Sequence, residues 1–147
     1  MTKGEFVDKI NRNTAENIIA KLAEKAKNAD GIDNLWTSPA SLKRHITQRE
    51  GYSHIEDLQD YRKKIINTLN TATHYSIAVS HLYPLVEITN KDWSVILNHL
   101  GEIKTAYKIE LNKPSFTDNQ LRLKYNVYEY EIRAGIKQKL RGLFNAR

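Results

Sequence analysis

The feature that most constrains the fold of this chain is a change of hydrophobic period near Thr73. Before it, apolar residues recur at the three- and four-residue spacing of amphipathic helices. After it, they alternate with polar residues, as in strands with one buried face. The alternating segments 93–98 and 103–111 are joined by a short loop that contains Gly101, which predicts a β-hairpin. Helices followed by a small antiparallel sheet belong to the α+β class, which is the fold class that we predict.

Two shorter alternating segments extend the predicted sheet. Residues 75–82 alternate as one strand. Pro84 then interrupts the pattern, because proline cannot donate a hydrogen bond to a neighbouring strand, and residues 85–89 are predicted as a separate short strand.

Amphipathic helices are predicted before the sheet, over residues 4–28, 38–50 and 55–69. Ser38 suits the N-cap of the second helix, and Pro39 suits its first turn because no partner is needed there for a backbone N–H. We divide the chain into an N-terminal helical segment, residues 1–33, and an α+β domain, residues 34–147. The first segment is either an appendage or an integral first helix of the domain.

The C-terminal part carries two competing patterns. Thr117 and Gln120 form a capping-box pattern, and a helical apolar stripe runs from Leu121 to Leu143. The residues from Leu121 to Val127 also alternate as in a strand, so residues 120–132 remain open between helix and strand. We favour the helix because its period persists longer. The predicted architecture is therefore N-terminal helices packed on a small antiparallel sheet, with a long C-terminal helix.

Composition narrows the classes of function. The 147 residues include 23 Lys and Arg against 17 Asp and Glu, a formal net charge of +6, which favours a polyanionic partner. The chain has no cysteine, so thiolate zinc sites and cysteine nucleophiles are excluded. No phosphate-binding glycine loop and no paired-histidine metal motif occurs, and we expect neither a metal nor a cofactor. We also expect no membrane span and no secretory signal, because no long apolar run is present.

Metal-free acid–base chemistry on RNA fits this basic chain. The 2′-OH of RNA can attack the adjacent phosphate if a side chain accepts its proton, another protonates the leaving oxygen, and cations or hydroxyls hold the charged phosphorane. Histidine suits the proton transfers. The predicted catalytic residues are His45, Thr105 and Tyr107, and the predicted RNA-binding residues are Lys43, Arg44, Arg49, His99, Lys104 and Lys108.

Several of these residues also have a structural interpretation. His45 lies beside Leu42 and Ile46 and can simply be packed, while His99 can be an exposed residue of the hairpin turn. Thr105 and Tyr107 are predicted on the same strand face as Ile103, where core packing is the default, with Lys104 and Lys108 on the opposite face.

The segments LWTSPASLKRHI (35–46) and GEIKTAYKIE (101–110) resemble the barnase–EndoU–colicin–RelE-like superfamily of small ribonucleases over residues 34–112. The basic-basic-histidine element is similar to that of tRNA-cleaving domains of the colicin D type. The resemblance implies that His45 is the acid–base residue, that Lys43 contacts phosphate, and that Thr105 and Tyr107 bind the phosphate or stabilise the transition state. Arg49 departs from a second histidine that some relatives carry.

The resemblance also implies a biological setting. It suggests a toxin domain that cleaves tRNA in the bacterial cytoplasm, delivered from another cell within a larger secreted protein. Such a toxin needs an acidic immunity protein or antitoxin that neutralises it. Two other interpretations remain: a non-catalytic nucleic-acid-binding protein of a phage or mobile element, and a protein-interaction module that uses the long amphipathic helices. Salt-dependent binding without cleavage would indicate the former.

Overall fold

A computed structural model describes residues 2–43, 57–79, 83–109 and 126–144. The elements are α1 (Lys3–Asn28), the 3-10 helix η1 (Ile32–Leu35), α3 (Leu58–Asn70), β1 (His74–Val79), β2 (Leu85–Thr89), β3 (Trp93–Leu97), β4 (Ile103–Lys108), β5 (Asn126–Glu131) and α5 (Ala134–Leu140). The five strands form one sheet in the order β4-β3-β2-β1-β5, and all neighbours are antiparallel. The predicted α+β class is confirmed.

The predicted helices at 4–28 and 55–69 correspond to α1 and α3. Thr2 caps α1 by accepting a hydrogen bond from Glu5 N at 3.1 Å, and Asp57 caps α3 through Asp60 N at 2.8 Å. Residues 39–43 are helical, and Ser38 accepts a hydrogen bond from Ser41 N at 3.1 Å, as expected of an N-cap. A side-chain cap therefore lies at the start of each of these helices, and the predicted cap at Ser38 is confirmed.

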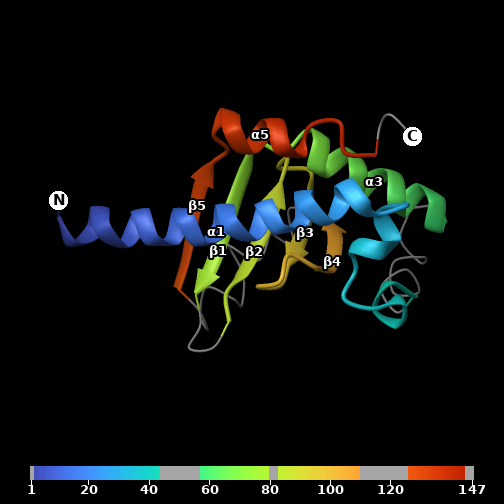
Figure 1. The fold of residues 1–147 in the computed structure, drawn as a ribbon, viewed down its shortest axis with the longest axis horizontal. Helices are drawn as coiled ribbons and strands as arrows, with labels where there is room; N and C mark the ends of the chain where they lie inside the picture. The colour runs from blue at the N-terminus through green and yellow to red at the C-terminus, as the bar shows by residue number, and fades with distance from the viewer. Residues whose placement is uncertain (1, 44–56, 80–82, 110–125, 145–147) are drawn as a thin grey trace.

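The helices lie on one side of the sheet (Figure 1). α1 crosses the strands, and α3 and α5 lie in the same layer as α1. A single apolar core fills the space between the two layers and includes Ile19, Leu22, Ile65, Val95 and Leu97. At its β4 end, the fully buried Tyr61 packs between Trp36 and Trp93, with ring centroids 6.1 Å from each. Its hydroxyl donates to Ala106 O at 2.6 Å, so the buried polar group is paired.

The prediction of a long C-terminal helix is wrong from residue 126 onward, while its predicted start, with Thr117 and Gln120, lies outside the described residues. Residues Asn126–Glu131 form β5, which pairs with β1 along its whole length, and the helix that follows is only Ala134–Leu140. The ring of Tyr130 packs on that of Tyr75 at 5.6 Å, and its hydroxyl donates to Asp8 at 3.1 Å. Burial, with this hydrogen bond, raises the pKa of Tyr130 to about 12. These residues form a strand because β1 has an open edge with which they can pair. Hydrophobic periodicity along the chain does not show that such an edge is available.

A polar cluster fastens α1 to the sheet. The Glu16 carboxylate accepts hydrogen bonds from Tyr75 Oη at 2.9 Å and from Arg133 Nε at 2.9 Å. Burial disfavours the charged carboxylate, but the hydrogen bonds from Arg133 and Tyr75 outweigh it and lower the pKa of Glu16. Burial and the contact with Glu16 raise the pKa of Tyr75 in turn.

The lowered pKa of Glu16 predicts a pH dependence of stability. A carboxylate whose pKa is lower when folded stabilises the protein above its unfolded pKa, near 4.5, and this contribution is lost as the pH falls through the folded pKa. The free energy of unfolding should therefore fall below pH 4.5, and fall less in Glu16→Gln. Urea unfolding at pH 6, 4.5 and 3 measures this. Glu24→Gln, an exposed acid on the same helix, is the control and should behave as wild type. Equal pH dependence in wild type and Glu16→Gln would contradict the assignment.

None of the helices within the described ranges is long and apolar enough to cross a membrane.

Candidate active site on the second face of the sheet

The sheet has a second face that points away from the helices. Its apolar cluster is made of strand residues alone, Ala78 and Ile96 with Leu85, Tyr107 and Val127, and no described helix contributes to it. We call this the second face. Its centre differs from the helix-covered face because it carries several polar side chains, namely Ser76, Glu87, Ser94, Thr105 and Tyr107.

Strand register places these polar residues in two adjoining rows. Ser76 of β1 lies opposite Glu87 of β2, and Ile96 of β3 separates Glu87 from Thr105 of β4. In the next row, Ser94 lies opposite Tyr107. Ser94 Oγ donates to Glu87 Oε2 at 2.8 Å, which joins the two rows. The register therefore collects a carboxylate and several hydroxyls on one surface.

Glu87 and Ser76 are unusual because they are buried. Glu87 is 1% exposed, although burial of a carboxylate is costly. Ser76 is fully buried, and its Oγ has no hydrogen-bond partner among the described residues. Buried polar groups are usually paired, so an unpaired hydroxyl beside a buried carboxylate indicates a site that is not optimised for stability alone.

A β-bulge in β4 changes the sheet face on which its side chains lie from the face that was predicted. Ile96 pairs with Thr105 but Leu97 pairs with Ile103, so Lys104 is an extra residue without a partner. Ile103 therefore points into the core, whereas Thr105 and Tyr107 point to the second face, not to the side of Ile103 as predicted. One inserted residue reverses every side chain that follows it.

The two lysines of β4 that were predicted to bind RNA, Lys104 and Lys108, do not lie together with Thr105 and Tyr107. Lys104 is exposed at the bulge. Lys108 alternates to the other face and forms an ion pair with Asp92 at 2.5 Å. Arg44, His45 and Arg49 lie outside the described residues. The described segment that precedes them is connected to β4, because Thr37 N donates to Ile103 O at 3.0 Å.

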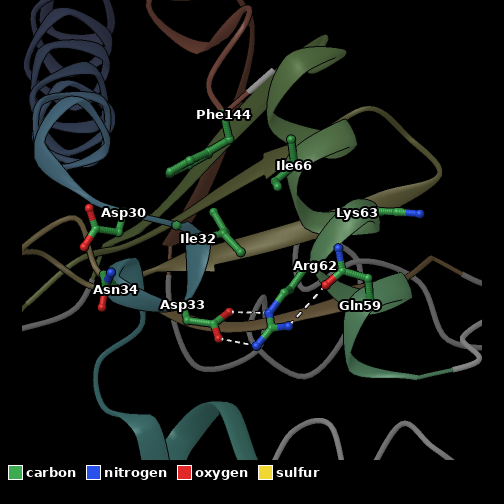
Figure 2. A pocket seen from close by; sticks show the side chains of 10 residues that line it. Asp30, Ile32, Asp33, Asn34, Gln59, Arg62, Lys63, Ile66 and Phe144 are labelled. Atoms are coloured by element: carbon green, nitrogen blue, oxygen red, sulfur yellow. Dashed lines mark hydrogen bonds and ion pairs between the residues drawn. The ribbon is translucent and has the colours of Figure 1, made fainter. Parts of the chain in front are cut away.

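Lys43 lines a pocket of about 330 Å³ together with Asp33, Asn34 and Leu58. A larger pocket, of about 500 Å³, shares Asp33 and Asn34 and lies between η1, α3 and Phe144. Figure 2 shows Arg62 among the side chains that line it, hydrogen-bonded to both Asp33 carboxylate oxygens and to Gln59. These contacts use three of the five N–H donors of the guanidinium, and the hydrogen bond to Asp33 raises the pKa of Arg62. The ion pair of Arg62 and Asp33 connects α3 to η1. Two acids, Asp30 and Asp33, balance the two cations of the pocket lining, Arg62 and Lys63, so the lining has no net positive charge for a phosphate.

His99 lies in the β3–β4 turn, away from the polar rows of the second face. Its ring stacks on that of Tyr83, with centroids 4.0 Å apart and planes inclined by 13°. The structure thus brings together two of the predicted site residues, Thr105 and Tyr107, and it leaves His99, Lys104 and Lys108 apart from them.

Sequence reasoning missed Glu87, Ser94 and Ser76. The available signal was weak: Glu87 is the only acid in the strand LVEIT, and an acid that alternates with Val86 and Ile88 normally faces solvent. Its burial depends on tertiary contacts. Within the described ranges, no group of His, Asp and Glu is arranged to hold a metal ion.

Residues 24–145 match the model of a family described as "Uncharacterised protein aq_aa01". No curated protein and no solved structure matches the chain.

Proposed function

We propose that this chain, which belongs to the family described as "Uncharacterised protein aq_aa01", is a metal-independent ribonuclease whose active site lies on the second face of its sheet. One observation carries the proposal: the bulge in β4 places Thr105 and Tyr107 on the same face as the hydrogen-bonded pair of Glu87 and Ser94. These side chains provide a proton acceptor and several hydroxyl donors within adjoining rows of one sheet.

Cleavage by the 2′-OH needs two proton transfers. His45 is one proposed acid–base residue, and Glu87 supplies the second, for which the sequence offered no firm candidate. A carboxylate accepts the proton of the attacking 2′-OH, and an imidazolium protonates the leaving 5′ oxygen. The hydroxyls of Thr105 and Tyr107 donate to the phosphorane oxygens, where charge develops.

The exposure of the site residues suggests the direction of approach. Glu87 and Ser94 are buried, while Thr105 and Tyr107 are only half-buried. RNA would therefore enter from the β4 side of the second face, and proton transfer to Glu87, which is 1% exposed, requires that the contacts that bury this carboxylate open when RNA binds. The net charge of +6 attracts a polyanion to the molecule.

The proposal extends to substrate and partner through the resemblance to small ribonucleases. We propose tRNA as the substrate class and the bacterial cytoplasm as the place of action, after delivery from another cell within a larger secreted protein. An acidic immunity protein or antitoxin is the proposed partner, because an acidic surface complements a basic nuclease.

A cleavage assay with EDTA tests the proposal. Purified protein is incubated with total bacterial RNA and EDTA, beside His45→Ala, and the RNA is read on a denaturing gel. Wild type should give discrete fragments, and His45→Ala should cleave at least about a hundredfold more slowly, the usual contribution of an acid–base group. His74→Ala is the matched control, because its ring contacts the Thr73 hydroxyl at 2.9 Å and has no proposed role. Intact RNA with wild type, also in cell lysate, would refute the nuclease.

A further inference from the structure

An aromatic pair stands at one end of the sheet. Tyr83 lies just before β2 and is 60% exposed, and its ring stacks on His99 of the β3–β4 turn, with centroids 4.0 Å apart. The neighbouring Leu100 is also exposed. A stacked pair of this kind fixes the orientation of the tyrosine ring while most of that residue stays accessible to solvent.

Two lysines of α1 flank the turn that carries His99. Lys25 Nζ donates to Leu100 O at 2.8 Å, and Lys21 Nζ donates to His99 O at 3.4 Å. Each ammonium has three donors, so one bond to a carbonyl leaves two for a ligand. Neither lysine is ion-paired with a carboxylate of the described residues. The turn therefore presents a fixed aromatic ring beside two cations.

We infer that the Tyr83–His99 pair is a stacking platform for an unpaired base of RNA, with Lys21 and Lys25 contacting the neighbouring phosphates. This inference rests on the proposed function for the choice of RNA as ligand. A base presents a planar π face and its backbone presents anions, and single-strand-binding proteins combine aromatic rings and cations in this way. In a duplex the base faces are covered by stacking, so the platform selects single-stranded segments such as loops.

The platform lies on a path that leads to the proposed active site. Tyr83 precedes Glu87 by four residues, which is about 13 Å in an extended strand. Leu85, between them, belongs to the apolar cluster of the second face. An RNA strand bound at Tyr83 can therefore place one of its next few nucleotides over the polar rows.

Binding to an uncleavable RNA tests the platform separately from catalysis. The probe is a fluorescently labelled single-stranded 2′-O-methyl oligoadenosine, which lacks the attacking hydroxyl. Fluorescence anisotropy should give a Kd that rises about five- to a hundredfold in Tyr83→Ala, the usual worth of one stacked base, and that stays near wild type in Tyr83→Trp. Lys25→Ala should reduce the slope of log Kd against log salt by about one unit. Phe6→Ala is the control, because it removes an exposed aromatic ring from the far end of α1.

The outcomes separate the two proposals. A wild-type Kd in Tyr83→Ala, or no binding of the probe by wild type, overturns the platform even if RNA is cleaved. Binding that depends on Tyr83 in a protein that leaves RNA intact supports the platform and refutes the nuclease.

Discussion

Replacement of Glu87 by Gln is expected to slow RNA cleavage at least about a hundredfold with the fold intact. The substitution keeps the shape of the side chain, and its amide oxygen can still accept the hydrogen bond that Ser94 Oγ donates at 2.8 Å. It removes the negative charge and the ability to accept a proton, and it replaces one acceptor oxygen by an amide N–H donor group. The measurement is the initial rate of cleavage of bacterial tRNA in EDTA, with the thermal unfolding midpoint of each variant recorded in parallel.

Glu129→Gln is the matched control for this prediction. Glu129 lies on the second face in the same row as Glu87, and Ser76 separates the two. Its carboxylate is ion-paired with Lys91 and is partly exposed. The control should therefore cleave at the wild-type rate. If Glu87→Gln also cleaved at that rate, Glu87 would be a structural polar residue, and the second face would lose its proposed acid–base partner.

Gly101→Ala is expected to lower the free energy of unfolding by about 2–5 kcal/mol, the sum of left-handed backbone strain and overpacking. Gly101 has φ +79°, a conformation that side chains with a Cβ rarely adopt. A Cβ there would lie 2.9 Å from Leu22 N and 3.0 Å from Ile18 O. Both contacts are with the backbone of α1, which cannot move without disturbing the core. Urea unfolding followed by circular dichroism measures the change.

Two other glycines separate the causes of this loss. Gly142 has the same φ of +79° but open space around the Cβ position, so Gly142→Ala reports conformational strain alone. Gly31 is extended, with φ −170°, and has no neighbour within 4 Å, so Gly31→Ala should be neutral or slightly stabilising. The expected order of destabilisation is Gly101, then Gly142, then Gly31. Equal losses at Gly101 and Gly142 would show that the turn does not press against α1.

β4 shows why the sheet face on which a side chain lies can be predicted wrongly even where the strand itself is predicted correctly. Alternation located the hairpin, because it depends on the sequence of each strand alone. The facing of Thr105 and Tyr107 depends on the bulge at Lys104, which exists only in the pairing with β3. The correction matters for function, because it moves both residues from the core side to the face of Glu87.

The polar contacts of the molecule could not be predicted from spacing. Arg62 of α3 binds Asp33, which lies 29 residues earlier in the chain. The stack of Tyr83 on His99 and the hydrogen bonds of Glu16 likewise join distant segments. Such pairs form because the packed layers bring their backbones together, and no local pattern records them.

The sequence by itself determined the α+β class, the helices α1 and α3 and the β3–β4 hairpin, because capping residues, hydrophobic period and a glycine turn act within a few residues of one another. The tertiary structure decided that residues 126–131 form a strand, that Thr105 and Tyr107 face away from the helices, and that Glu87 is buried. Each of these outcomes depends on a neighbouring strand. The strand 126–131 depends on the open edge of β1, the facing of Thr105 and Tyr107 on the shifted register with β3, and the burial of Glu87 on the rows of side chains across the sheet. Hydrogen bonding between strands is non-local, so only the assembled sheet could settle them.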